Sequence, residues 1–319
     1  MAAFRSLVRL LAILGAVALA AACAPAPSGA GAPLKVASQK GGTKALMLAS
    51  GALDGAPYKV EWSEFPAAQH LLEALSAGAV DVGGVGDAPF IFAYASGVNI
   101  RAVHASRSSA GGGSVALLVP PGSPLKRVAD LRGRKVATGR GSVGHYVLLR
   151  LLDQAGLKPS EVTIVFLSPG DAKAAFTSGA IDAWSTWGAY VGAATLHDGA
   201  RILADGRGLL SGYGFQVATP KAIAGKRPQL QDFLRRLDKA QQWAIAHPDP
   251  YAQVLARETG LPLDIARYTA ARTSAVAAPI DDGLVAEERR TLERFQAAGA
   301  VETSPDLDAA FDRSFNPSR

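Results

Sequence analysis

A glycine-rich turn near the middle of the chain carries the groups needed to bind an anion. The segment Gly139-Arg140-Gly141-Ser142-Val143-Gly144 follows an apolar run and precedes a stretch with helical periodicity. Glycines let backbone N–H groups approach a ligand closely, a serine hydroxyl adds a donor, and a helix N-terminus favours negative charge. We therefore expect Gly141 and Ser142 to contact an anion; a plain glycine turn capped by serine is the alternative.

The same turn also fits the Gly-x-Gly-x-x-Gly pattern of dinucleotide-binding proteins. That pattern needs an acidic residue at the end of a second strand about 20 residues further on. Glu161 lies near that distance, but it precedes its predicted strand, Val162–Leu167, instead of ending it. The sequence therefore disfavours a nucleotide site.

Two pairs of segments repeat along the chain at nearly equal offsets. Lys35–Gly42 resembles Lys135–Ser142 at an offset of 100 residues, and Ala77–Val82 resembles Ser178–Ala183 at an offset of 101. Independent repeats with one spacing predict two lobes of the same β-α-β-α plan. Short apolar strands that alternate with helices predict an α/β fold in which each lobe is a sheet flanked by helices.

In such sheets ligands bind at the carboxyl ends of the strands, so two facing lobes would enclose one cleft. Gln39 and Thr43 occupy the position in lobe 1 that matches the glycine-rich turn of lobe 2. Their amide and hydroxyl could donate hydrogen bonds from the opposite side. Lys40 could pair with the anion or remain solvated.

Gly86 and Asp87, which follow the third predicted strand, are further candidate ligand residues. Because a carboxylate repels an anion, we expect Asp87 to accept hydrogen bonds from nearby backbone amides and to hold the loop that ends at Pro89. A ligand amine is the alternative partner of this carboxylate.

Aromatic residues supply a candidate wall for an organic tail. Trp184 and Trp187 follow the last predicted strand of lobe 2 and could sandwich the tail, with Phe90 and Phe215 adding to the wall. Ordinary core packing is the alternative for all four rings.

Strand and helix patterns divide the chain into lobes. Residues 34–116 and 216–319 form lobe 1 and residues 117–215 form lobe 2, because Val115–Val119 and Phe215–Ala218 are the predicted crossing strands. The other predicted strands of lobe 1 are Leu34–Ser38, Tyr58–Trp62 and Val80–Val82. The predicted C-terminal helices are Pro228–Ala246, Pro250–Thr259, Leu263–Ala270 and Glu287–Ala298.

The N-terminus has the pattern of a secretory signal. Arg5 and Arg9 precede the apolar stretch Leu10–Leu19, which is too short to span a membrane. We expect a signal peptide over residues 1–23 and a flexible tether over 24–33. Cys23 resembles the lipid-attachment site of bacterial lipoproteins, although Ala20 stands where a leucine is usual; an ordinary cleaved signal is the alternative.

Composition excludes several function classes. The formal net charge is only +6 and the chain has no long run of Lys and Arg, which disfavours a nucleic-acid surface. The five histidines are scattered without metal-ligand spacing, and Cys23 is the only cysteine. These features indicate neither a metal site nor catalytic residues, and we expect no cofactor; a monomeric state is expected as well.

Several motifs, taken in order, resemble the periplasmic aliphatic-sulfonate-binding proteins of ABC importers, within the nitrate/sulfonate/taurine group. The resemblance covers most of the chain from Leu34 on, and its segments include Gln39–Gly41, Glu64–Ala67, Gly86–Ala93, Gly133–Ala137, Gly141–His145, Asp171–Phe176 and Asp182–Trp184. It implies a type II periplasmic-binding-protein fold, a ligand cleft between the lobes, and a permease with its ATPase as partners. From its position in this resemblance, His145 is expected to contact the ligand, although it could instead cap its helix.

The resemblance implies an alkane- or arylsulfonate as the ligand. Taurine, nitrate or a thiamine-pyrimidine precursor, a thiamine-pyrimidine-synthase-like enzyme and a binding subunit for a sensor kinase are the alternatives. The sequence departs from the relatives at Gly188-Ala189, where many carry an acidic residue and a proline, and at Phe90, where many carry a proline. Losing a carboxylate there predicts a tail that is larger or more apolar than that of taurine.

Overall fold

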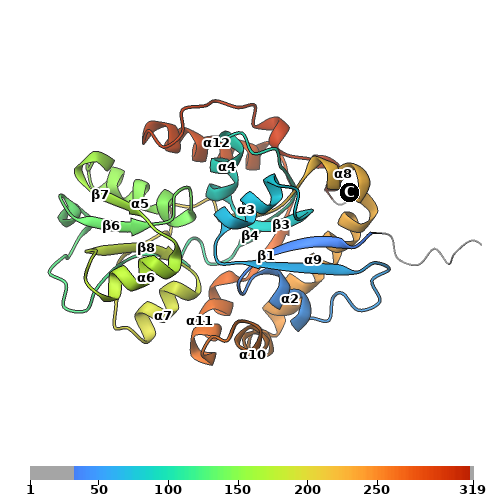
Figure 1. Cartoon of the computed structure of the whole chain (residues 1–319), viewed down its shortest axis with the longest axis horizontal. Helices are drawn as coiled ribbons and strands as arrows, with labels where there is room; N and C mark the ends of the chain where they lie inside the picture. Colours follow the sequence, from blue (N-terminus) through green and yellow to red (C-terminus); the bar gives the residue numbers. More distant parts are fainter. Residues whose placement is uncertain (1–31, 317–319) are drawn as a thin grey trace, which may run out of the picture.

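The computed structural model describes residues 32–316, which form two lobes, each a β-sheet flanked by helices (Figure 1). The expected signal peptide, Cys23 and most of the tether lie outside the described residues. The sheet of lobe 1 has the strand order β11-β4-β10-β3-β1-β2, and the sheet of lobe 2 has the order β7-β6-β8-β5-β9.

The strands of lobe 1 are β1 (Leu34–Gln39), β2 (Val60–Phe65), β3 (Val82–Gly86), β4 (Arg101–Ser108), β10 (Tyr213–Ala218) and β11 (Ala275–Ala278). Those of lobe 2 are β5 (Val115–Val119), β6 (Lys135–Thr138), β7 (Thr163–Phe166), β8 (Ala183–Trp187) and β9 (Arg201–Asp205). The helices are α2 (Thr43–Ala49), α3 (Ala68–Ser76), α4 (Asp87–Ala95), α5 (Val143–Gln154), α6 (Pro169–Thr177), α7 (Ala189–Leu196), α8 (Pro220–Gly225), α9 (Arg227–Ala246), α10 (Pro248–Thr259), α11 (Leu263–Thr273) and α12 (Asp282–Ala297).

The two sheets share one plan. β1 lies between parallel partners β2 and β3, and β6 lies between parallel partners β7 and β8. An antiparallel strand follows in each sheet, β10 beside β3 and β5 beside β8. The Asp81 carboxylate accepts from the N–H of Lys35 at 2.7 Å, and Asp182 accepts from the N–H of Lys135 at 2.8 Å. The predicted repeat is therefore confirmed in topology and in a matching side-chain contact.

The chain crosses between the lobes a few residues earlier than predicted. β5 pairs with β8 from Val115 on, so the whole strand belongs to the sheet of lobe 2. β10 pairs with β4 from Tyr213 on, so that strand belongs wholly to the sheet of lobe 1. The predicted boundaries cut through both strands, because an apolar run marks a buried strand but not the sheet in which it pairs.

Strand β3 spans Val82–Gly86, not Val80–Val82 as predicted. The strand continues through Gly83, although a glycine more often weakens or ends a strand. A Cβ at Gly83 would lie 2.9 Å from the Cβ of Ala37 and 2.8 Å from Cδ2 of Leu71. The glycine is therefore needed for close packing between β1, β3 and α3, and does not mark a loop.

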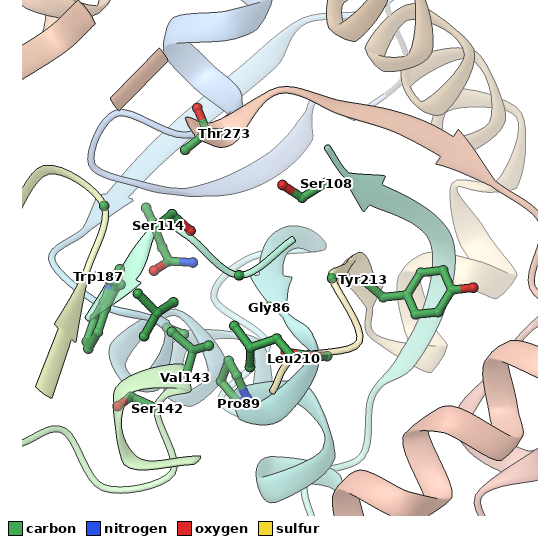
Figure 2. Close-up of a pocket in the computed structure, with 17 residues that line it drawn as sticks. Gly86, Pro89, Ser108, Ser114, Ser142, Val143, Trp187, Leu210, Tyr213 and Thr273 are labelled. Carbon is green, nitrogen blue, oxygen red and sulfur yellow. The ribbon is translucent and has the colours of Figure 1, made fainter. Parts of the chain in front are cut away.

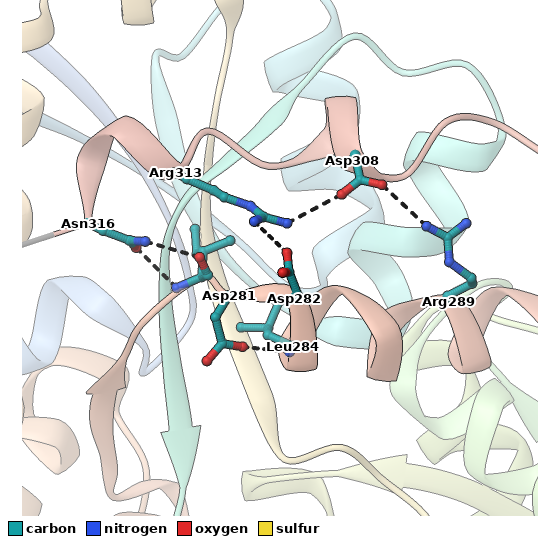
Figure 3. Close-up of polar contacts among 8 residues, drawn as sticks. Asp281, Asp282, Leu284, Arg289, Asp308, Arg313 and Asn316 are labelled. Atoms are coloured by element: carbon teal, nitrogen blue, oxygen red, sulfur yellow. Dashed lines mark hydrogen bonds and ion pairs between the residues drawn. The ribbon is translucent and has the colours of Figure 1, made fainter.

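The C-terminal segment is bonded to the start of α12, which begins earlier than predicted (Figure 3). Asp281 caps the helix by accepting from the N–H of Leu284 at 2.9 Å. Arg313 pairs with Asp282 at 2.6 Å and with Asp308 at 3.3 Å. These contacts hold the end of the described chain against lobe 1.

The lobes touch each other across the cleft at several points. Gln69 on α3 donates to the carbonyl of Arg140 at 2.8 Å, and the Tyr190 hydroxyl on α7 donates to the carbonyl of Pro66 at 3.3 Å. Helix α11 of lobe 1 also packs against α7 of lobe 2. A ligand held between the lobes would therefore be enclosed by both.

Candidate ligand-binding cleft

Two adjoining cavities lie between the lobes, where the carboxyl ends of the strands face each other. The first, here called the apolar compartment, has a volume of about 220 Å³. Its apolar wall includes Val115 together with Pro89, Val143, Trp187 and Leu210, the last four of which are labelled in Figure 2. The second, the polar compartment, has a volume of about 330 Å³, and its polar lining includes Thr43, Gln216, Gln241, Tyr251, Arg272 and Thr273. Both are bordered by Gln39, Gly86, Ser108, Ser114 and Thr273. One ligand can therefore extend from one compartment into the other.

The lobe 1 candidates Gln39, Thr43 and Gly86 all border the cleft. Gln39 is the last residue of β1, and its Nε2 donates to the carbonyl of Gly84 at 3.2 Å, which fixes the amide at the cavity wall. Thr43 is the first residue of α2 and faces the polar compartment. Lys40 is exposed and borders neither compartment.

Ser142 is the N-cap residue of α5 and borders the apolar compartment. Its hydroxyl caps the helix by accepting from the N–H of His145 at 3.1 Å. The N–H groups of Val143 and Gly144 have no hydrogen-bond partner among residues 32–316. Of these two first-turn groups of α5, the N–H of Val143 belongs to a residue that borders the apolar compartment and is available to a ligand.

Gly141 and His145 lie behind this turn and do not border the cleft. The N–H of Gly141 donates to Nδ1 of His145 at 3.2 Å. Gly141 has φ +66°, and a Cβ there would collide with the ring of Phe92 in lobe 1. The His145 ring packs against Phe166 at a centroid distance of 5.0 Å, and burial lowers its pKa to about 4. The predicted ligand contact of both residues is thus replaced by a role in shaping the turn and the contact between the lobes.

Asp87 borders the apolar compartment and is almost completely buried. Its carboxylate accepts from the N–H of Ala88 at 2.7 Å and from the hydroxyl of Ser211, as expected for contacts with nearby donors. The predicted loop up to Pro89 is instead the first turn of α4. Burial raises the pKa of Asp87. Glu288 on α12 is fully buried nearby, and burial together with the charge of Asp87 raises its pKa well above the usual value. A buried pair of acids therefore adjoins the apolar compartment.

Of the two predicted tryptophans, only Trp187 borders the cleft. Trp184 is 2% exposed and packs in the core of lobe 2 against Phe176 at a centroid distance of 5.8 Å. Both tryptophans lie on β8, where successive side chains point to opposite faces, so residues three apart cannot share a face. The predicted sandwich of a ligand between both rings is therefore wrong.

Phe90 and Phe215 pack against each other in the core of lobe 1 at a centroid distance of 5.2 Å. Phe215 borders the polar compartment, whereas Phe90 borders neither compartment. Because α4 already begins at Asp87, its first turn directs Phe90 into the core. The proposed contribution of Phe90 to a ligand wall is therefore wrong.

The described residues include no cluster of three His, Cys, Asp or Glu side chains that could hold a metal ion. Over the same range, 32–316, no helix combines the length and the apolar character needed to cross a membrane.

Comparison with known proteins decides the family. The model of the NMT1/THI5-like family matches residues 59–250, which is more than half of the chain. The chain belongs to the NMT1/THI5-like family. Among solved structures, this NMT1/THI5-like protein is similar to the alkanesulfonate-binding protein from Xanthomonas axonopodis pv. citri bound to MOPS. The TM-score is 0.81, with 32% sequence identity, and the match covers 89% of this chain and 99% of that chain.

Two further relatives agree on the class of protein. The periplasmic aliphatic sulphonate-binding protein from Escherichia coli has a TM-score of 0.75 and 33% identity, over 86% of this chain and 90% of that chain. The taurine-binding periplasmic protein of Escherichia coli (strain K12) is 32% identical over 213 residues, covering 64% of this chain and 65% of that protein. The expected two-lobed α/β binding-protein fold of this NMT1/THI5-like chain is confirmed.

Several residues of the polar compartment were missed in the sequence of this NMT1/THI5-like protein. Gln216, Gln241 and Arg272 come from β10, α9 and α11, which lie far from the motifs at the ends of the parallel strands. No local spacing marks any of them, because they meet only after the C-terminal helices pack on lobe 1. The predicted helix Leu263–Ala270 ends two residues before Arg272, whereas α11 continues to Thr273 and includes it.

Proposed function

We propose that this protein is the substrate-binding component of an ABC importer and that it captures an organic sulfonate between its two lobes. The observation that carries the proposal is one continuous cleft with a polar end and an apolar end. A sulfonate has a permanently charged group with three acceptor oxygens and an organic tail, so its host needs donors at one place and apolar surface at another. The similarity to two sulfonate-binding proteins supports the same ligand class.

The experiment is a thermal-shift panel on protein purified without denaturation, after native mass spectrometry has shown any ligand carried through purification. The panel contains alkane- and arylsulfonates, taurine, nitrate, sulfate and amino acids. We expect stabilisation by sulfonates, because ligand binding to the folded state raises the melting temperature. Stabilisation by nitrate alone, with no response to any sulfonate, would refute the proposal.

Taurine is the second candidate, because a taurine-binding protein is among the relatives and Asp87 borders the apolar compartment. The Asp87 carboxyl, however, is already engaged by Ala88 and Ser211, and burial raises its pKa. A buried carboxyl whose oxygens already accept hydrogen bonds is a poor partner for an ammonium group. We therefore propose a tail that is larger or more apolar than that of taurine.

Position 188 supports this preference, since Gly188 borders the apolar compartment and a side chain built on it would meet open space. Its φ of +57° makes aspartate there strained, so Gly188→Asp would combine backbone strain with added charge. Trp187, which has an ordinary strand conformation, is the better position at which to change the tail pocket.

We propose that the protein works in the periplasm, as the names of two relatives say of those proteins, and that an ABC permease with its ATPase receives the ligand. We also propose a monomer, to be tested by analytical ultracentrifugation, and lipid attachment at Cys23. If Cys23→Ser leaves the incorporation of labelled palmitate and the membrane partitioning unchanged, the lipid anchor is wrong and an ordinary cleaved signal remains.

A further inference from the structure

The two compartments differ in charge. Within the part of the chain that the structure describes, the lining of the polar compartment includes the guanidinium of Arg272 and no carboxylate. The lining of the apolar compartment includes the carboxyl group of Asp87 and no basic side chain. An anion entering this cleft therefore meets a cation at one end and an acid at the other.

Arg272 presents its guanidinium without an acidic partner among residues 32–316. Both of its interactions with described residues involve Tyr268: Nη1 donates to the Tyr268 carbonyl at 3.3 Å, and the guanidinium carbon lies 3.8 Å from the centroid of the Tyr268 ring. Stacking fixes the plane of the guanidinium and leaves most of its N–H groups free. A planar fork of N–H groups matches pairs of oxygens on an oxyanion.

Gln216 adds a buried amide whose hydrogen bonds are incomplete. The residue is 7% exposed, and its Oε1 has no hydrogen-bond partner among the described residues. Its Nε2 lies 3.5 Å from Oγ1 of Thr43. Amide oxygen and nitrogen exchange by a half-turn of the side chain. In the turned form the oxygen accepts from the Thr43 hydroxyl, and the NH₂ group becomes available to an anion in the polar compartment.

Tyr251, which is also buried, supplies a third donor at the same place. Burial raises the pKa of Tyr251 to about 12, so its hydroxyl keeps its proton at every physiological pH. Guanidinium, amide and phenol therefore surround one cavity that no carboxylate borders.

We propose that the polar compartment holds the sulfonate group, with Arg272 and Gln216 as its specificity-determining residues, and that the tail extends through the apolar compartment toward Trp187. This inference rests on the proposed function. It places the permanent charge beside a cation and away from Asp87, and it places the tail against apolar side chains. It also differs from the expectation that the sulfonate sits on the Gly139–Gly144 turn of lobe 2.

The position of Arg272 links capture of the anion to contact between the lobes. Tyr268, on which the guanidinium stacks, faces Gly192 on α7 of lobe 2; a Cβ at Gly192 would lie 2.9 Å from Cδ1 of the tyrosine. The ring that holds the guanidinium is therefore itself packed against the opposite lobe. An anion bound by Arg272 in lobe 1 would stabilise the arrangement in which the lobes touch.

The first test compares Arg272→Ala with Arg257→Ala by titration calorimetry. Arg257 is exposed on α10 and borders neither compartment, so it controls for the loss of one positive charge. The ligands are ethanesulfonate and neutral ethanesulfonamide. We expect Arg272→Ala to lower the affinity for ethanesulfonate about tenfold to a hundredfold, as is typical of losing a hydrogen bond to a charged group. The affinity for ethanesulfonamide should change much less. Arg257→Ala should bind both ligands like the wild type.

The second test is Gln216→Glu, which places a carboxyl at the proposed sulfonate position without changing the size of the side chain. We expect ethanesulfonate binding to be lost at pH 8 and to recover as the introduced carboxyl takes up a proton at lower pH. Wild-type binding measured over the same pH range shows any pH dependence caused by the native groups around position 216. These groups are Tyr251, Arg272 and His104, whose ring is bonded to Asp238 at 2.6 Å.

The outcomes separate this inference from the proposed function. If wild-type protein binds no sulfonate at all, the proposed function fails. If wild-type protein binds ethanesulfonate, Arg272→Ala and Gln216→Glu bind it equally well, and Ser142→Ala loses it, the sulfonate sits on the turn of lobe 2. The proposed function then stands and this inference is overturned.

Discussion

Replacing His145 by asparagine should change how the stability of the protein depends on pH. Burial lowers the pKa of this histidine from 6.5 to about 4, so the native ring stays neutral while the unfolded chain takes up a proton. The unfolded state then binds more protons between these two pH values, and the native state loses stability as pH falls through this window. Asparagine keeps an acceptor for the N–H of Gly141 but does not titrate.

The magnitude follows from the two pKa values. The pKa of the ring is about 4 in the folded protein and 6.5 in the unfolded chain. This difference lowers the free energy of unfolding of the wild type by about 3 kcal/mol as pH falls from 6.5 to 4. At pH 7 the variant should be less stable than the wild type, because the smaller side chain leaves space beside Phe166. At pH 4 that deficit should shrink by about 3 kcal/mol, because only the wild type carries the cost of the neutral ring.

The assay is urea denaturation of both proteins at pH 7, 6, 5 and 4, with the difference in free energy of unfolding plotted against pH. His70→Asn is the matched control, because the His70 side chain is 46% exposed on α3. A difference between wild type and His145→Asn that stays constant from pH 7 to pH 4 would refute the reasoning. It would mean that the ring is not held neutral by the fold.

Three further predictions concern the buried acids, the contact between the lobes and the tail pocket. Burial raises the pKa of Glu288, so the folded protein is most stable below the ordinary pKa of 4.5 and loses stability as pH rises and the carboxyl must ionise. Glu288→Gln should therefore stabilise the protein at pH 8 but not at pH 4. An equal gain in the free energy of unfolding at both pH values in urea denaturation would contradict this. Gly141→Ala should weaken the binding of every ligand at least tenfold, because its Cβ would collide with Phe92. Gly78→Ala, at a φ of +67° against +66° and with open space around the Cβ, should bind ligands normally in calorimetry, and equal affinities of the two variants would contradict this. Trp187→Ala should lower the affinity for hexanesulfonate about tenfold more than the affinity for ethanesulfonate in calorimetry, because losing some 60 Å² of apolar contact corresponds to about 1.5 kcal/mol of binding free energy. An equal loss of affinity for both ligands would place the tail elsewhere.

Much of the fold could be predicted, because it depends on patterns that are local in the chain. The repeated Lys35 and Lys135 segments start equivalent strands, and their contacts with Asp81 and Asp182 match. Serine is a favoured N-cap and proline a favoured first helical residue, and Ser168 caps α6 while Pro169 is its first residue. Strand β11 was not predicted, since Ala275–Ala278 is short and gains its structure only by pairing with β4.

The site was harder to predict, because side-chain direction depends on exact element boundaries. Trp184 and Trp187 were both placed in the cleft, yet strand alternation puts them on opposite faces of β8. Phe90 was predicted to add to the wall, but it lies in the first turn of α4 and its ring packs in the core of lobe 1. Gln216 and Arg272 meet only through the packing of lobe 1, and no sequence spacing records that contact.

The central claim, that the cleft captures organic sulfonates, is tested most directly by calorimetric titration of the wild-type protein. The ligands are ethane-, butane- and hexanesulfonate, with taurine and nitrate for comparison. We predict one-to-one binding of the sulfonates, affinity that rises with tail length, and no binding of nitrate. One-to-one binding of nitrate together with no heat from any sulfonate would contradict the account.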